Sequence, residues 1–174
     1  RARQARIAAE GSESNSSEIS MEDDRDDLLD ALRAAIDLGL ADDALDLARG
    51  LGTLWDLRGY GHVQEQLLER AIALGRQAEA DPSRLANAML WSAYLGLRHS
   101  SAVDRDELVA RIRSAEQLAS SVGDDRAAFH AQSVWLLVTP ITGDVVQAQA
   151  AVEEGLRLAE RNGHDGWRAT IQVW

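Results

Sequence analysis

Apolar residues recur every three or four positions along most of this chain, a spacing typical of amphipathic α-helices. No stretch alternates apolar and polar residues with a period of two, so no β-strand is expected. The pattern predicts seven to eight consecutive antiparallel helices. Their expected limits are a first helix that stops at Gly39, helices over 41–57 and 62–78, one after Asp81-Pro82, one over 104–122, one from Asp124 or Asp125, one from Gly143-Asp144 to 162–163, and a last one from Asp165.

Residue types with known preferences for helix ends support several of these limits. Asp81 followed by Pro82 is typical of an N-cap and a first helical position, and Gly123 is typical of the residue that ends a helix. Pro140 lies inside the apolar pattern of the sixth helix. Because proline removes a backbone hydrogen bond and clashes with the preceding turn, we expect that helix to kink or end early.

The helices repeat in pairs. A shift of 40 residues lays "DRDELVARIRSAEQLASSVG" (104–123) over "DVVQAQAAVEEGLRLAERNG" (144–163), with aspartates and glycines aligned. The second repeat is about four residues longer, and we place the extra residues in "RHSSAV" (98–103). One helix pair cannot bury its apolar face alone, and stacked neighbours supply the missing wall. The sequence therefore predicts an all-α, tetratricopeptide-like solenoid of helix hairpins in a right-handed superhelix.

Two glycines flank a tyrosine in Gly59-Tyr60-Gly61, which raises the possibility of a phosphate-binding loop. Such a loop needs a preceding strand and a following lysine or third glycine, and the sequence has neither. The segment falls where Thr142-Gly143-Asp144 falls in a later repeat. We therefore expect a corner between paired helices, where glycine supplies the left-handed backbone of a helix end.

Residues 1–18 differ in composition from the remainder. Residues 1–10 are basic, and "GSESNSSE" (11–18) is polar, which favours an N-terminal segment and flexible linker. Residues 19–174 form the predicted helical-repeat domain. The chain starts without methionine and stops at "GWRATIQVW", inside an apolar pattern. We therefore expect a piece of a longer polypeptide, truncated within its repeat domain, whose last helix is covered by a further repeat or by self-association.

Composition narrows the possible functions. The chain has 29 acidic and 18 basic residues, a net charge of −11, and no lysine. Nucleic-acid binding needs clustered basic residues, so direct contact with nucleic acid is not expected. Cysteine is absent, which excludes disulfides and thiolate chemistry. No apolar run reaches the length of a membrane span and no signal peptide opens the chain, so we expect a soluble cytoplasmic protein. The heavy use of Ala, Leu, Arg and Asp indicates a bacterial genome rich in G and C.

No catalytic constellation is found, and we expect this segment not to be an enzyme. The four histidines are widely spread, and no pair has the spacing of a helical zinc site. Adjacent carboxylates such as Asp42-Asp43 and Glu153-Glu154 fall at helix starts or on polar faces, where they complement the helix dipole or stay solvated. Serines show no nucleophile-elbow pattern. No metal and no cofactor are expected.

Aromatic residues on the first helices of successive pairs are the candidate binding residues. In a tetratricopeptide-like superhelix those helices line the concave surface, where aromatics could anchor a peptide or stack on a flat ligand, with arginines supplying charge. The alternative is that they are wedges packed between repeats. Both interpretations stay open at this stage. The candidate residues are Trp55, Arg58, Tyr60, Trp91, Tyr94, Arg98 and Trp135.

The block "DLLDALRAAIDLGLADDALDLARGLGTLWDLRGYGHVQEQLLERAIAL" (27–74) resembles the opening of a tetratricopeptide-like array. Such arrays occur in large bacterial signal-transduction ATPases and transcriptional activators of the LuxR/MalT and antibiotic-regulatory (SARP-like) types. "RSAEQLASSVGDDRAA" and "VEEGLRLAERNGHDGWRA" are similar to the ends of these repeats. The resemblance covers about residues 25–174. It implies a parent protein with a DNA-binding or output domain, often with an ATPase, which the repeats restrain.

Together these observations predict a non-enzymatic interaction and sensor module within a bacterial transcriptional or signalling regulator. Its concave face would bind a protein segment or a neighbouring domain of the same chain, and the acidic surface favours a basic partner. The alternative is a small-molecule effector receptor that uses the aromatic groove to shift a conformational equilibrium. A deep pocket around Trp55, Tyr94 and Trp135 would favour the receptor, and an open groove would favour a protein partner.

Overall fold

The structure, a computed structural model, describes residues 25–58, 61–99 and 104–172. These residues form eight α-helices and no strand. The helices are α2 (Arg25–Asp37), α3 (Ala41–Arg58), α4 (His62–Gln77), α5 (Pro82–His99), α6 (Arg105–Val122), α7 (Asp125–Thr142), α8 (Val145–Arg161) and α9 (Asp165–Gln172). The predicted all-α class and the predicted helix limits are confirmed, to within a few residues at each end. The predicted linker over residues 1–18 lies outside the described residues.

Aspartate side chains cap the start of four described helices, and the first is Asp81, which accepts from the amide of Arg84 in α5 as predicted. Asp104 accepts hydrogen bonds from the backbone amides of Asp106 and Glu107 at the start of α6. Asp124 accepts from the amides of Arg126 and Ala127 at the start of α7, and Asp144 caps α8 in the same way. Each carboxylate satisfies amides that have no partner within the first helical turn. Asp104 and Asp144, which align in the sequence repeat, therefore both act as N-caps.

The corners that link one helix pair to the next share one backbone conformation. Gly39, Glu79, Gly123 and Gly163 follow α2, α4, α6 and α8, and all four have a positive φ, of 73°, 50°, 68° and 60°. After each of them, the next residue donates its amide to a carbonyl five residues earlier, which is the closing bond of a Schellman motif. These positions are 40, 44 and 40 residues apart. The repeat read from the sequence is thus present in the backbone.

Pro140 does not end its helix early, contrary to one of the expected outcomes. α7 continues past the proline to Thr142 and stops at Gly143, whose left-handed backbone closes the helix by donating to the carbonyl of Thr139. The proline lies in the last turn, so few hydrogen bonds depend on it. Only the bond from position 140 to the carbonyl four residues earlier is lost.

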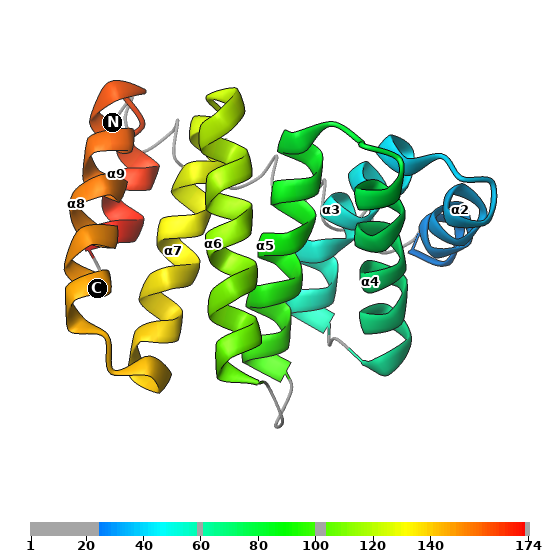
Figure 1. Cartoon of the computed structure of the whole chain (residues 1–174), viewed down its shortest axis with the longest axis horizontal. Helices are drawn as coiled ribbons and strands as arrows, with labels where there is room; N and C mark the ends of the chain where they lie inside the picture. Colours follow the sequence, from blue (N-terminus) through cyan, green and yellow to red (C-terminus); the bar gives the residue numbers. More distant parts are fainter. Residues whose placement is uncertain (1–24, 59–60, 100–103, 173–174) are drawn as a thin grey trace, which may run out of the picture.

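The helices lie in two layers along the long axis of the molecule. In Figure 1, α4 is drawn in front of α3, α6 in front of α7, and α8 in front of α9. Within the rear layer α3 packs on α5, α5 on α7 and α7 on α9. Among the described residues, the backbones of α4, α6 and α8 do not pack on one another, although Arg111 of α6 pairs with Glu69 of α4. We call the exposed side of α3, α5 and α7 the inner face. The stacked hairpins agree with a helical solenoid, and the right-handed superhelix stays a prediction.

Glycines let neighbouring helices approach closely. A Cβ atom built on Gly52 of α3 would lie 2.5 Å from the indole of Trp91 on α5. A Cβ on Gly155 of α8 would lie 2.7 Å from Ile171 of α9. At Gly155 the end of the isoleucine side chain could shift, but at Gly52 the neighbour is a rigid aromatic ring, so this position requires glycine for packing. The indole of Trp91 therefore sits directly against the backbone of α3.

The corner at Gly59-Tyr60-Gly61 separates two paired helices, as expected. α3 ends at Arg58 and α4 begins at His62. Gly61 is the N-cap of α4 in an extended conformation, with φ −109° and ψ 179°, and its amide donates to the side chain of Gln64. Gly59 and Tyr60 lie outside the described residues, as does the expected insertion at 100–103.

Candidate functional site

A pocket of about 350 Å³ opens on the inner face, where three successive rear-layer helices each present one stripe of side chains. We call it the inner-face pocket. Residues spaced by three or four positions on a helix share one side, and the lining follows this rule on every helix. The lining is Arg49 and Thr53 from α3, Asn87 and Trp91 from α5, and Arg126, Phe129, His130 and Ser133 from α7.

Aromatic rings form the apolar part of this pocket. Trp91 is half-buried, and its ring meets Tyr94 and His130 edge-on, at centroid distances of 5.5 Å and 5.3 Å. Phe129 is buried and stacks on Trp167 of α9 at 4.5 Å. Because these rings pack on one another and on Gly52, the floor of the pocket is rigid.

Hydrogen-bond donors surround the apolar floor. The guanidinium of Arg126 makes no hydrogen bond or ion pair with any described residue. The guanidinium of Arg49 lies 3.8 Å from Asp46, beyond hydrogen-bonding distance, and the other oxygen of Asp46 is closer, at 3.2 Å, to Arg84. Both arginines therefore keep donors free to bind a ligand.

His130 is the third polar group with free capacity. Burial and the nearby positive charge of Arg126 lower its pKa to about 4. The ring is therefore neutral at pH 7 and presents one donor and one acceptor. Among the described residues no group forms a hydrogen bond with it. Part of the ring reaches the pocket, so these two positions can serve a ligand.

Asp124 reaches Asn87 of the pocket lining, and its oxygens are already engaged. One oxygen accepts the two backbone amides at the start of α7, and the other accepts from Ser83 and, at 3.5 Å, from Asn87. Burial alone would raise the pKa of Asp124, but the hydrogen bonds, first of all that of Ser83, outweigh it and hold the pKa below its usual value. The carboxylate thus stays ionised and orients Asn87.

A second polar cluster lies at the other end of the inner face. Tyr94 donates to Asp56 at 2.9 Å, and Arg98 pairs with the same carboxylate at 2.9 Å while its guanidinium lies over the tyrosine ring. His99 lies 3.6 Å from Asp56. Burial, followed by the bond to Asp56 and the charge of Asp56, raises the pKa of Tyr94. The phenol therefore stays protonated. Asp56 Oδ2 accepts its hydrogen bond, whereas the buried Oδ1 is within ion-pair distance of Arg98 and His99 but accepts no hydrogen bond.

The structure brings together three of the candidate residues and separates the others. Trp91, Tyr94 and Arg98 lie on one stripe of α5, at the inner face. Trp55 is 1% exposed and Trp135 is 3% exposed, so both are core residues that cannot contact a ligand in this conformation. Trp135 donates to Glu116 of α6 and so points away from the inner face. The inner-face pocket is not lined by Trp55, Tyr94 or Trp135. The side chain of Arg58 and all of Tyr60 lie outside the described residues.

Sequence reasoning missed Asp56, Arg49, Arg126 and His130. The sequence signal that could have identified them is the side of each helix on which a residue lies. Trp91 sets which side of α5 is half-exposed, and Asn87 is one turn before it on that side. The corresponding positions of the neighbouring first helices then become candidates, although the pairing of α3 with α7 across α5 cannot be read from spacing alone.

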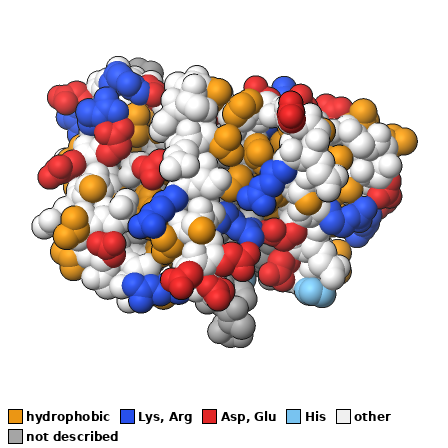
Figure 2. Space-filling view, in the orientation of Figure 1, with side chains coloured by type: hydrophobic (Ala, Val, Ile, Leu, Met, Phe, Trp, Pro, Cys, Tyr) orange, Lys and Arg blue, Asp and Glu red, His pale blue; other side chains and the backbone are white. Residues whose placement is uncertain are grey.

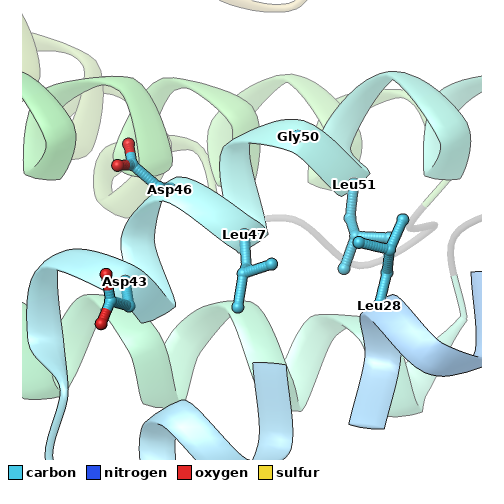
Figure 3. Close-up of a pocket in the computed structure, with 6 residues that line it drawn as sticks. All are labelled: Leu28, Asp43, Asp46, Leu47, Gly50 and Leu51. Carbon is cyan, nitrogen blue, oxygen red and sulfur yellow. The ribbon is translucent and has the colours of Figure 1, made fainter. Parts of the chain in front are cut away.

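Two further hollows lie elsewhere. One, of about 380 Å³, is formed by α2 and α3, with three leucines and two aspartates in its lining; Figure 3 shows Leu28 and Leu51 close together, with Asp43 and Asp46 on the first turns of α3. The other, of about 530 Å³, lies between α4 and α6 over α5. Figure 2 shows hydrophobic side chains gathered there, on a face where acidic and basic groups are interspersed.

Unlike the inner-face pocket, neither of these two hollows has an aromatic side chain in its lining. In the described parts of the chain, no three His, Asp or Glu side chains are arranged to hold a metal ion. No helix of those parts is long and apolar enough to pass through a bilayer.

Comparisons with protein-family models, curated proteins and solved structures found no match to this chain.

Proposed function

We propose that this chain is a non-enzymatic helical-repeat interaction and sensor module of a larger bacterial regulator, acting in the cytoplasm, and that it binds a protein segment or a neighbouring domain on its inner face. The observation that carries the proposal is the inner-face pocket, to which α3, α5 and α7 each contribute one stripe of side chains. A ligand there contacts three repeats at once. Its binding would bias how those repeats sit against one another, which is what a sensor requires.

The resemblance of residues 27–74 to repeat arrays of LuxR/MalT-type and SARP-like regulators supports the assignment to transcriptional or signalling control. In that setting, release or restraint of an adjoining domain is the output. The sequence shows no catalytic arrangement of side chains, which supports a binding role for this chain. Any chemistry would then belong to other parts of the parent protein.

A second function, reception of a small-molecule effector, is favoured by the dimensions of the pocket. A volume of about 350 Å³ is within the range of small-molecule sites. An aromatic floor with a few convergent polar groups is also typical of such sites.

A binding screen with a matched pair of variants tests the proposed function. Thermal-shift and titration experiments with peptide arrays and metabolites should find a ligand that binds the native chain. Thr53→Glu places a charge at an exposed position of the inner face, and Gln149→Glu places the same charge on α8. We expect the first variant to lose binding and the second to retain it. Equal binding by both would place the ligand elsewhere and refute the inner-face assignment.

A further inference from the structure

The inner-face pocket has the opposite charge character to the rest of the chain. Its lining holds two arginines, a histidine, an asparagine and a serine, but no Asp or Glu. The whole chain has 29 acids against 18 bases. The hollow between α2 and α3 has the reverse lining, with two aspartates and no basic residue. A donor-rich pocket in an acidic protein selects for a ligand that brings its own negative charge.

The donors are placed on two sides of the aromatic floor. Arg49 comes from α3 and Arg126 from α7, with Trp91 of α5 between these helices. Guanidinium groups bind carboxylates through paired N–H donors, and the indole and Phe129 offer apolar surface to a flat group beside them. From this geometry, we propose that the inner-face pocket binds a small organic carboxylate with a flat, apolar body, with the carboxylate held by Arg126 and Arg49 and the body packed against Trp91.

A compact ligand fits this face better than an extended peptide. A peptide would need partners along the whole face, but Asp56, Tyr94 and Arg98 at the other end are engaged with one another. At the pocket end, the guanidinium of Arg126 and the ring of His130 form no hydrogen bond with any described residue. The pocket volume of about 350 Å³ suits one or two fused rings with a carboxylate. The inference rests on the proposed function, and names the ligand chemistry of the same site.

The test compares pairs of probes of the same shape, one with a charged carboxylate and one with a neutral carboxamide. Calorimetric titration of the full chain with benzoate, 2-naphthoate and indole-3-acetate, each beside its neutral carboxamide, measures whether the negative charge matters. We expect at least one carboxylate to bind saturably and about tenfold or more tightly than its amide, because hydrogen bonds to a charged group are the stronger kind. Binding that is equal for acid and amide would overturn the proposal, and so would the failure of all three acids to bind.

Variants then locate the bound carboxylate. Arg126→Gln and Arg49→Gln should each weaken the carboxylate about tenfold, because each removes a charged donor. Arg157→Gln on α8 makes the same change in charge at an exposed residue far from the pocket, and should leave the affinity within twofold. Circular dichroism confirms that each variant is folded. Loss of affinity in all three variants alike would mean that net charge, and not the pocket, attracts the probes.

The outcomes also separate this inference from the proposed function. If the carboxylates fail but a peptide binds in a manner abolished by Thr53→Glu, the inner face binds a protein segment and the proposed ligand chemistry is wrong. If neither kind of ligand binds, both the proposed function and this inference are refuted for the inner face.

Discussion

Replacing Glu79 with glycine should stabilise the protein. Glu79 is the single non-glycine residue with a positive φ among the described residues, at 50°, and it occupies the corner position that glycine fills after α2, α6 and α8. In this region the Cβ atom of an L-residue crowds the following carbonyl. The glutamate side chain is exposed and forms no hydrogen bond or ion pair with any described residue, so the substitution removes no such contact.

The size of the effect follows from two opposing contributions. A left-handed conformation costs a residue with a Cβ about 1–2 kcal/mol, and glycine removes this cost. Glycine also gives the unfolded chain more backbone freedom, and losing this freedom opposes folding by roughly 0.5–1 kcal/mol. The expected net gain is about 0.5–1 kcal/mol. For a protein of this length, such a gain raises the melting temperature by about 1–4 °C.

Urea unfolding followed by circular dichroism measures the change, with two matched variants. Glu79→Ala removes the carboxylate but keeps the Cβ atom, so its stability should stay near that of the native chain. Gly163→Ala adds a Cβ at an equivalent corner, where φ is 60° and no atom lies within 4 Å of the added carbon, and should lose about 1 kcal/mol. If Glu79→Gly is no more stable than Glu79→Ala, the strain assigned to this corner is absent.

Three further outcomes follow from the packing and the hydrogen bonds. Gly52→Ala places a carbon 2.5 Å from the Trp91 ring and should cost about 1–3 kcal/mol in urea unfolding; an unchanged midpoint would contradict the close contact of α3 and α5. The folded pKa of His130, about 4, lies below the ordinary 6.5, so the unfolded chain binds more protons between these values and stability falls as the pH falls through this window. The unfolding free energy should drop by about 2 kcal/mol from pH 7.5 to pH 5 on this account, and His130→Gln should remove that part; an equal drop in the variant would refute it. Asp124→Ala loses two amide bonds and the bond from Ser83 and should cost about 1–2 kcal/mol, more than Asp144→Ala, which loses one cap bond; equal losses would show that the extra bonds contribute nothing.

The helices and their limits could be predicted because their signals are local. Apolar spacing defines the buried stripe of each helix, and Asp124 and Gly123 lie next to each other where one helix ends and the next begins. Glu79 was not recognised as a corner residue because glutamate carries no preference for the left-handed region. Its place is determined by the helices on either side. Pro140 misled in the other direction, because its cost depends on how many helical bonds lie beyond it, and here the helix has only two further residues.

The inner-face pocket was less predictable because it depends on which side chains of α3, α5 and α7 face the inner side of the array. Trp91, Tyr94 and Arg98 share one side of α5, so their grouping follows from spacing. Trp135 is also on a first helix, but it packs toward α6. α7 is apolar on most of its surface, and its orientation is set by four neighbouring helices. Arg49 and Arg126 come from helices that are far apart in sequence and meet only through α5.

The order of packing along the array also bears on how the chain folds. Every described helix packs only on helices one or two places away in the chain, from α2 on α3 and α4 to α7 on α8 and α9. Contacts so local in sequence need little loop closure before they form, and proteins of low contact order fold quickly. Structure can then spread from any interior hairpin toward both ends. Amide hydrogen exchange should therefore be fastest in α2 and α9, which among the described helices have neighbours on one side only, and slowest in α5.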